Sequence, residues 1–328
     1  MTMQALVLSQ YNGPLELTTL ARPEPLSGQV LVRIAAAGLN PLDTKIRAGG
    51  AAHAKHPLPL VLGIDMAGVV EAVGAGVTRF KAGDEVYGMT GGVGGIQGSL
   101  AQHAAVDADL LAPKPTNLSM REAASLPLVF ITAYMGIVDR AKLQAGQTVL
   151  VQGGAGGVGH VSVQLARALG ARVFATASAR DHDELTRLGA TPIDYAAQNV
   201  EQYVAQHTGG VGFEVVSDTV GGATLDASFA AVKHFGHVVS ALGWGTHALA
   251  PLSFREATYS GMFTLHALLS GENRAHHGEM LREATRLAEA GQLTPRLDPR
   301  RFDLRSAEQG YDAIAERSAR GKIVVDIE

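Results

Sequence analysis

The chain has 328 residues, of which 46% are hydrophobic and 18% are charged, and its formal net charge is -4 at neutral pH. Cysteine is absent, which excludes disulfides, thiolate catalysis and cysteine-rich zinc sites. No segment concentrates lysine and arginine over more than a few residues, so no nucleic-acid partner is indicated.

The N-terminal residues 1–10 have the pattern of a strand with polar interruptions, and they lack a basic region followed by an apolar core. No run of 18 apolar residues occurs anywhere in the sequence. A membrane span or a secretory signal would require one of these patterns. We therefore expect a soluble, cytoplasmic protein with no membrane partner.

The first part of the chain, up to about residue 120, is rich in short β-type runs separated by glycine and proline. Examples are Gln29–Ile34, Gly68–Val73 and Glu85–Tyr87. This spacing favours a small barrel or sandwich over alternating helices. A chain of this length is typical of two domains, each able to bury its own core.

From about Arg121 the pattern changes to an alternation of strands and helices. Apolar β-type runs are followed by helical patterns, the first ending near Leu169 and the second near Leu188. The expected strands are Thr148–Val151, Arg172–Thr176, Phe213–Val216 and His237–Ser240. Such β-α-β-α order predicts a doubly wound parallel sheet, so the fold class is α/β.

The last segment contains one strong helical pattern and one short strand pattern. Apolar residues recur at helical spacing from Gly278 to Ala290, and Gly291 ends the pattern. A final strand is expected at Lys322–Val325.

A glycine-rich turn lies directly between the first strand of the second region and its helix. It reads Gly154-Ala155-Gly156-Gly157-Val158-Gly159. One glycine makes a tight turn, the next lets a pyrophosphate approach the backbone, and the third lets helix and strand pack closely. The N–H groups and the helix dipole then hold the phosphates. In this context we expect dinucleotide binding; the alternative is a purely structural turn.

The tip of the following strand indicates which dinucleotide binds. It reads Ala177-Ser178-Ala179-Arg180, without the acid that accepts hydrogen bonds from the ribose in NAD-specific folds. A hydroxyl and a guanidinium are available for a 2′-phosphate. We assign Asp181 and Asp183 to the first turn of the next helix, where acids favour the dipole. The tip thus predicts NADPH over NADH.

Five segments together resemble the medium-chain dehydrogenase/reductase superfamily, in its zinc-free quinone oxidoreductase branch. They are Gly38–Arg47, Gly63–Gly68, Lys81–Val86, the glycine turn and Gly321–Val325. The resemblance implies a GroES-like β-domain, residues 1–123 and 263–328, and a Rossmann domain that binds NADPH, residues 124–262. It also implies a homodimer.

Zinc-containing members of this superfamily carry a cysteine ligand where this chain has Asn40 and a histidine where it has Ile64. Asparagine is a poor zinc ligand and isoleucine is none, so we expect no metal. A saturated ketone needs a Lewis acid to hold the charge that develops on its oxygen. Losing the metal favours acceptors that delocalise this charge themselves, namely quinones and α,β-unsaturated carbonyls.

Three residues are candidates for the acceptor site by their family positions. Asn40 could donate an amide N–H to a substrate oxygen or the nicotinamide ribose, or could be a turn residue before Pro41. Lys45 stands where many zinc-free relatives have tyrosine; it could stabilise an oxyanion, pair with Asp43 or extend into solvent. Thr132 matches a position near the cofactor, or is simply a helix residue.

Four further residues are expected around the cofactor. Tyr195 follows the third strand of the sheet, where relatives often have a tyrosine near the 2′-phosphate. Arg317 resembles a basic residue that reaches the same phosphate in some relatives, although the alternative, a solvated arginine on the last helix, is slightly favoured. Asp218 and Gly243 follow the next two strands and should face the cofactor crevice.

The leading hypothesis from the sequence is an NADPH-dependent, zinc-independent reductase of small-molecule quinones or α,β-unsaturated carbonyls. A second is an enoyl thioester reductase, which would need a basic groove for the carrier's phosphate, and the sequence shows no such cluster. A third is a nucleotide-binding protein with little turnover.

Overall fold

The computed structural model describes residues 1–327. The chain divides into two compact units, each treated by itself below. Unit 1 comprises Met1–Leu128 and the segment from Leu265 onward, and unit 2 comprises Val129–Thr264. The boundaries expected from the sequence, 123/124 and 262/263, fall slightly before these points.

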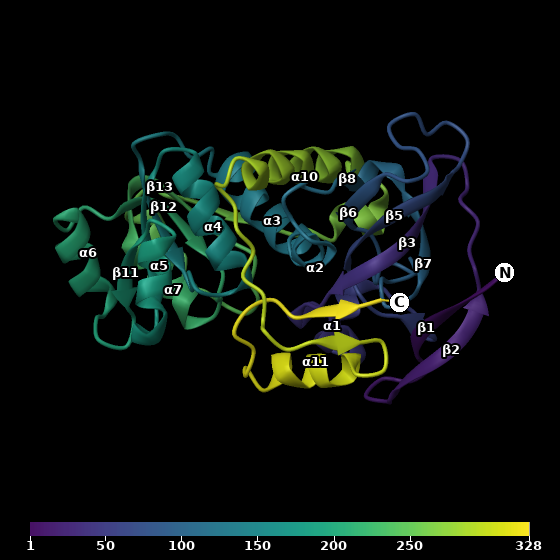
Figure 1. The fold of residues 1–328 in the computed structure, drawn as a ribbon. Helices are drawn as coiled ribbons and strands as arrows, with labels where there is room; N and C mark the ends of the chain where they lie inside the picture. The colour runs from purple at the N-terminus through teal and green to yellow at the C-terminus, as the bar shows by residue number, and fades with distance from the viewer. Residues whose placement is uncertain (328) are drawn as a thin grey trace. The chain divides into compact units, whose positions relative to one another are not determined.

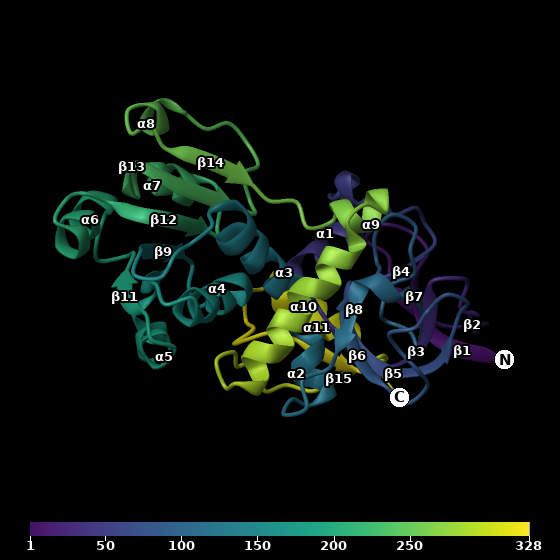
Figure 2. The ribbon, with the colours of Figure 1, turned by 90° about the horizontal axis from the view of Figure 1, so that it is seen from above.

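Unit 2 is built on a six-stranded sheet in the order β11-β10-β9-β12-β13-β14, in which every pairing is parallel (Figures 1 and 2). This is the strand order of a doubly wound dinucleotide-binding fold. The predicted parallel sheet is therefore confirmed. The strands are β9 (Thr148–Gln152), β10 (Arg172–Ala177), β11 (Thr191–Asp194), β12 (Phe213–Asp218), β13 (Val232–Ser240) and β14 (Thr258–Gly261).

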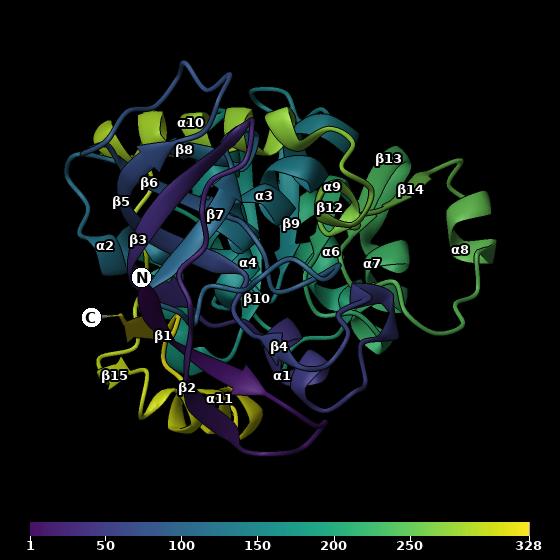
Figure 3. The same ribbon diagram turned by 90° about the vertical axis from the view of Figure 1, so that its right-hand side faces the viewer.

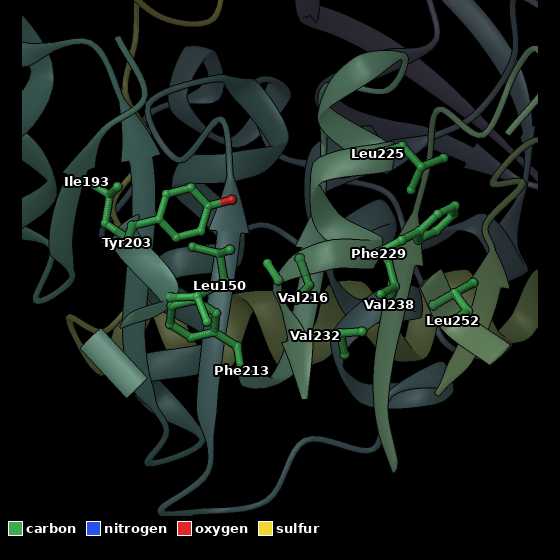
Figure 4. Close-up of a cluster of buried hydrophobic side chains, with 12 residues drawn as sticks. Leu150, Ile193, Tyr203, Phe213, Val216, Leu225, Phe229, Val232, Val238 and Leu252 are labelled. Carbon is green, nitrogen blue, oxygen red and sulfur yellow. The ribbon is translucent and has the colours of Figure 1, made fainter. Parts of the chain in front are cut away.

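The central strand β9 shows why the sequence folds in this way. All five of its residues are buried, as expected for a strand of a parallel sheet that is covered on both faces. On one side, Phe213 and Phe229 belong to a cluster of buried apolar side chains drawn in Figure 4. The rings of Phe174 and Phe213 lie 5.2 Å apart. This packing fixes the sheet whose edge carries the candidate site.

From α4 onward, the helices of unit 2 connect consecutive strands of its sheet. Helix α4 begins after the N-cap residue Gly156 and ends at Ala168, followed by the C-cap Leu169 and by Gly170 in the left-handed conformation, a usual way for a helix to end. The helical segments are α3 (Pro127–Tyr134), the π-helix η3 (Met135–Arg140), α4 (Gly157–Ala168), the 3-10 turn η4 (Ala179–Asp181), α5 (His182–Arg187), α6 (Val200–Thr208), α7 (Ala223–Ala231) and α8 (Ala250–Ser253). Helix α3 begins before Val129 and so crosses the boundary between the units.

Unit 1 contains two sheets. A hairpin of β1 and β2 extends through β4 into a three-stranded sheet, and a seven-stranded sheet joins β15, β16, β3, β5, β6 and β8, with β7 paired to β3 (Figure 3). The strands are β1 (Thr2–Leu8), β2 (Leu15–Ala21), β3 (Gln29–Gly38), β4 (Leu60–Val61), β5 (Asp65–Val73), β6 (Glu85–Met89), β7 (His103–Asp107), β8 (Leu111–Pro113), β15 (Phe302–Asp303) and β16 (Val324–Asp326). The expected β-rich first region is confirmed.

The helices of unit 1 pack against these sheets. Helix α2 packs on β3 and β5, which keeps the residues just after position 123 within unit 1. The helical segments are α1 (Pro41–Arg47), η1 (Ala52–Ala54), η2 (Ala108–Leu110), α2 (Met120–Ala124), α9 (His266–Ser270), α10 (Arg274–Glu289) and α11 (Ala307–Ala315). The predicted C-terminal helix is α10, which begins at Arg274 rather than Gly278, and its expected apolar face is buried.

Candidate functional site

The glycine turn of unit 2 connects β9 to α4, as its sequence predicted. The backbone N–H of Gly154 donates to the carbonyl of Thr176 on β10 at 2.9 Å. A Cβ added at Gly154 would lie 2.6 Å from the Cβ of Ala175, and one at Gly159 would lie 2.1 Å from the carbonyl oxygen of Gly153. Real Cβ atoms do not approach so closely, so both positions require glycine for the helix and strands to pack.

The middle glycine of the motif has a different environment. A Cβ at Gly156 would meet only the carbonyl oxygen of Gly153, at 3.2 Å, within a 4 Å radius. Gly156 is the N-cap of α4, and the first N–H groups of an α-helix have no acceptor within the helix. The turn therefore offers N–H groups and open space together, which is the arrangement that holds a pyrophosphate.

Two predicted residues lie next to each other at the tip of β10. Strand β10 pairs with β11 so that Ala177 faces Asp194, which places Ser178 and Tyr195 as neighbours where the two strands end. Tyr195 is 62% exposed, and the side chain of Arg180 is 84% exposed. These groups are accessible for a ligand at this edge.

The structure corrects one inference about this tip. Asp181 belongs to the 3-10 turn η4 rather than to the first turn of α5, and its carboxylate turns back to the strand end. Its Oδ2 accepts from the hydroxyl of Ser178 at 3.1 Å and from Nε of Arg180 at 3.2 Å. The expectation of an acid-free tip is wrong. The signal was the three-residue spacing from Ser178 to Asp181, which is typical of a turn closed by side chains.

Asp218 and Gly243 shape the loops at the ends of β12 and β13. The buried carboxylate of Asp218 accepts from the backbone N–H of Gly221 at 3.0 Å and from the hydroxyl of Ser240 at 2.6 Å. A Cβ at Gly243 would lie 2.1 Å from the hydroxyl oxygen of Tyr259. Asp218 thus organises a loop through its own hydrogen bonds, and Gly243 allows a close approach to the backbone.

One edge of the parallel sheet therefore brings together most of the predicted cofactor residues. The carboxyl ends of parallel strands meet at the same edge. The predicted residues at the ends of β9 to β13 are the glycine turn Gly154–Gly159, Ser178, Arg180, Tyr195, Asp218 and Gly243. Thr132 also belongs to unit 2, in α3, and is 5% exposed. Asn40, Lys45 and Arg317 belong to unit 1, and Arg317 is exposed, directly after α11.

Unit 1 contains a buried cluster of polar and charged side chains around Asn40. The Asn40 amide nitrogen lies 3.0 Å from Oδ2 of Asp65 and 3.4 Å from the carbonyl oxygen of Gly38. The Asn40 amide oxygen accepts a hydrogen bond from the Lys322 ammonium. Because both amide hydrogens and the oxygen are used within unit 1, and the residue is 0% exposed, Asn40 has no donor left for a substrate in this arrangement.

Two carboxylates and one ammonium share this interior. Asp43 accepts from the backbone N–H of Asn40 at 2.8 Å, and Asp65 accepts from the backbone N–H of Leu128 at 2.9 Å. The ammonium of Lys322 donates to the carbonyl of Leu39 at 3.0 Å and lies 3.9 Å from Oδ2 of Asp65. The structural hydrogen-bonding role expected for Asp43 and Asp65 is confirmed.

Burial dominates the ionisation of this cluster. Desolvation raises the pKa of Asp43 to about 7 and that of Asp65 to about 6. Desolvation also lowers the pKa of Lys322, against the attraction of both carboxylates. In each case the low-dielectric interior disfavours the charged form. The cluster thus places three titrating groups with shifted pKa values beside Asn40, a predicted site residue.

Lys322 is the member of the cluster that the sequence did not identify as a site residue. It was expected to begin the last strand, but β16 starts two residues later, and Lys322 points into the interior instead. Its hydrogen-bond acceptors, Leu39 and Asn40, lie 283 and 282 positions away in the sequence. No local pattern could show this contact. Lys45, by contrast, lies exposed on α1, whereas Asp43 of the same helix is buried.

Within residues 1–327, no group of three or more histidine, aspartate or glutamate side chains has the arrangement of a metal site. Ile64, which stands where zinc-containing relatives carry a histidine, has an aliphatic side chain that is 0% exposed. None of the helices described is both long enough and apolar enough to span a membrane.

Comparison with known proteins identifies the class. Residues 26–116 match the family described as alcohol dehydrogenase GroES-like domain, and residues 188–325 match the family described as zinc-binding dehydrogenase. The chain is 35% identical to the NADPH-dependent alkenal/one oxidoreductase, chloroplastic, of Arabidopsis thaliana, over 98% of this chain and 79% of that protein. It is 29% identical to the quinone oxidoreductase of Sus scrofa, over 98% and 97% of the two chains.

A solved structure agrees over the whole chain. A crystal structure of an alcohol dehydrogenase superfamily protein from Novosphingobium aromaticivorans has a TM-score of 0.98 and 61% sequence identity, covering 100% of both chains. The chain therefore belongs to the medium-chain dehydrogenase/reductase superfamily, in the quinone oxidoreductase branch that its motifs predicted. It is an oxidoreductase of a class that depends on a nicotinamide dinucleotide.

Proposed function

We propose that this chain is an NADPH-dependent reductase that transfers a hydride to quinones or α,β-unsaturated carbonyl compounds without a metal. The observation that carries this proposal is the replacement of a metal site by a closed polar cluster. At the two positions where zinc-containing relatives carry ligands, this chain has an amide bound to Lys322 and Asp65, and a fully buried isoleucine.

The cofactor assignment is supported by the edge of the parallel sheet in unit 2. The turn Gly154–Gly159 would hold the pyrophosphate, because two of its glycines permit the packing and the third leaves room for the phosphates. Ser178, Arg180 and Tyr195 would bind the 2′-phosphate, since a half-buried hydroxyl, an exposed guanidinium and an exposed phenol lie where β10 and β11 end. We further propose that Arg317 supplies a second positive charge to this phosphate.

The chemistry of the acceptor follows from the groups that the protein has. A bound reduced nicotinamide supplies the hydride. Without a Lewis acid, no metal stabilises the negative charge that forms on the acceptor oxygen, so the acceptor must delocalise this charge itself. A quinone does so as a phenolate and an enone as an enolate. Modest hydrogen-bond donation to this oxygen then suffices, and solvent returns the proton.

Three residues have proposed roles at the acceptor. Lys45 is exposed and charged, so it is the proposed donor to the acceptor oxygen. Thr132 has a hydroxyl on α3, and we propose that it positions the cofactor. Asn40 was a candidate donor, but its amide is used within the buried cluster. We therefore propose Asn40 as a positioning residue that fixes the start of α1, on which Lys45 lies.

The proposal also includes a homodimer, formed through the Rossmann unit. Strand β14 is the last strand of its sheet, so one row of its backbone groups faces outward. Light scattering on the purified protein tests this part. The cytoplasmic location stays a prediction from the sequence.

The proposal is tested by following NADPH oxidation with 1,4-benzoquinone, an enal, a saturated ketone, an enoyl thioester and no acceptor. We expect turnover with the quinone or the enal and none with the ketone. A preference for the thioester would favour the enoyl thioester reductase instead. Tight NADPH binding with no turnover on any acceptor would favour a nucleotide-binding protein.

A matched pair of substitutions tests the cofactor assignment. Arg180→Ala should weaken NADPH binding about tenfold while changing NADH binding little, because a charge-assisted hydrogen bond to phosphate is lost. Arg187→Ala removes the same charge from α5 at a position where the guanidinium is paired with Glu184, and it should spare both cofactors. Equal weakening of NADPH and NADH by Arg180→Ala would contradict the assignment.

A further inference from the structure

The two donors assigned to the 2′-phosphate already share an acceptor. The hydroxyl of Ser178 and Nε of Arg180 both donate to the same carboxylate oxygen, Oδ2 of Asp181, at 3.1 Å and 3.2 Å. The side chain of Asp181 is 14% exposed, whereas that of Arg180 is 84% exposed. The carboxylate is therefore held inside the turn, and the guanidinium approaches it from solvent.

We propose that Asp181 is a specificity-determining residue that occupies the 2′-phosphate subsite in the absence of NADPH and weakens the enzyme's preference for NADPH over NADH. This inference rests on the proposed function, since it takes Ser178 and Arg180 as the phosphate donors. It assigns to Asp181 a role that opposes theirs.

Competition follows from the chemistry of the three groups. A serine hydroxyl has a single hydrogen to donate, so Ser178 can bind the Asp181 carboxylate or a phosphate oxygen with full strength, but not both. A phosphate that enters beside the carboxylate also meets a like charge, which opposes binding. NADH has no 2′-phosphate, so its binding leaves the contacts of Asp181 with Ser178 and Arg180 in place. The binding of NADPH must break these contacts.

The geometry keeps Asp181 close to the tip. Its backbone N–H donates to the carbonyl of Ser178 at 2.9 Å, which closes the 3-10 turn η4. The carboxylate can rotate away, but its backbone cannot leave the subsite without opening this turn. Arg180 is free to move, because an exposed ion pair stabilises its geometry by little. The binding of NADPH therefore transfers the guanidinium from carboxylate to phosphate while the negative charge remains near.

Neighbouring acids do not share this position. Glu184 in α5 forms two hydrogen bonds with the guanidinium of Arg187, at 2.7 Å and 2.9 Å. Asp183 is exposed in the first turn of α5. Asp181 is thus the acid whose hydrogen bonds reach the strand tip, and Asp183 offers a matched control with the same charge two residues away.

The test compares Asp181→Asn with Asp183→Asn in the full-length protein. Dissociation constants for NADPH, NADH and adenosine 2′-monophosphate are measured by titration. For Asp181→Asn we expect NADPH and adenosine 2′-monophosphate to bind about three- to tenfold more tightly, because a like charge beside the phosphate is removed, and NADH to change less than twofold. For Asp183→Asn the dissociation constants of all three ligands should stay near those of the parent protein.

Two outcomes would overturn the inference. If Asp181→Asn weakens the binding of NADH and leaves that of NADPH unchanged, the carboxylate binds the ribose. If the affinities for both cofactors change equally, or neither changes, the carboxylate only maintains the turn. Melting temperatures of both variants show whether the turn stays folded.

A double-mutant cycle keeps the test informative if Asp181→Asn changes the turn. In the Ser178→Ala background the gain from Asp181→Asn should shrink, because one of the two contested donors is gone. If the binding free-energy changes of the two substitutions are fully additive, the inference is contradicted. The proposed function fails separately: if Ser178→Ala and Arg180→Ala leave NADPH binding unchanged, the phosphate assignment is wrong. If they weaken it while Asp181→Asn has no effect, only the role of Asp181 is wrong.

Discussion

The strand tip of unit 2 and the buried cluster of unit 1 contain similar groups in opposite settings. At the tip, a serine, an arginine and an aspartate are joined by hydrogen bonds at a partly exposed edge. In the cluster, an asparagine, two aspartates and a lysine are joined within a fully buried interior. Contacts at the tip are exchangeable for a ligand, because solvent and phosphate can replace them. Contacts in the cluster are not, because nothing else could satisfy the groups.

The comparison is tested most strongly by removing the ammonium of the cluster. Lys322→Met should lower the free energy of unfolding by about 3–5 kcal/mol, because it leaves a buried carboxylate unpaired. Lys45→Met removes the same charge from an exposed position of α1 and should change stability by less than about 0.5 kcal/mol. Chemical denaturation followed by circular dichroism measures both. Similar small effects would show that Lys322 is not required to balance the cluster.

The pH dependence of stability should also reveal the cluster. The pKa of Asp43 is raised to about 7 and that of Asp65 to about 6, from 3.8 for each in the absence of burial. Between pH 4 and 7 the folded state therefore holds more protons than the unfolded state, so stability falls as the pH rises. We expect a loss of several kcal/mol, at most about 7 kcal/mol, between pH 4 and 8, measured by denaturation at each pH. A flat profile above pH 4 would contradict the raised pKa values.

The acid side of the same profile provides a contrast. Hydrogen bonds from Arg300 lower the pKa of Asp298 from 3.8 to about 2. A lowered pKa contributes stability that is present above pH 4 and is lost as the pH falls toward 2. Asp298→Asn should remove this acid-side loss and leave the slope above pH 4 unchanged. A change in the slope between pH 4 and 7 would show that the two regions are coupled.

The glycine turn allows packing and binding to be separated. Gly159→Ala should destabilise the fold by about 1–3 kcal/mol, because its Cβ would clash with the carbonyl oxygen of Gly153. Gly156→Ala has a milder contact of 3.2 Å, so the protein should fold while NADPH binding is lost. Melting temperature and NADPH titration measure the two effects. Normal NADPH binding by Gly156→Ala would contradict the placement of the pyrophosphate.

The smallest expected effect concerns Tyr195. Tyr195→Phe removes one hydroxyl at the exposed tip and should weaken NADPH by about threefold, as for one ordinary hydrogen bond. The exposed Tyr11, on a loop of unit 1, provides a control in Tyr11→Phe, which should have no effect. Cofactor titration distinguishes them, and an equal loss of NADH binding would place Tyr195 at the adenine rather than the phosphate.

The sequence predicted the parallel sheet, the position of the glycine turn and the strand ends that carry Ser178 and Tyr195. These features depend on short-range patterns: apolar runs, glycine spacing and turn residues. It did not predict the carboxylate of Asp181 at the tip, because a side chain's direction in a turn depends on one or two backbone angles. It also did not predict Lys322 in the cluster, because that contact joins segments from opposite ends of the chain.

The central claim is that the buried cluster around Asn40 and Lys322 replaces the metal. It is tested most directly by measuring activity after metal removal. The protein is dialysed against a chelator, its zinc content is measured, and NADPH oxidation with 1,4-benzoquinone is followed before and after zinc is returned. We predict unchanged turnover in zinc-free protein and no gain when zinc is added. Loss of turnover on chelation, with recovery on addition of zinc, would contradict the account.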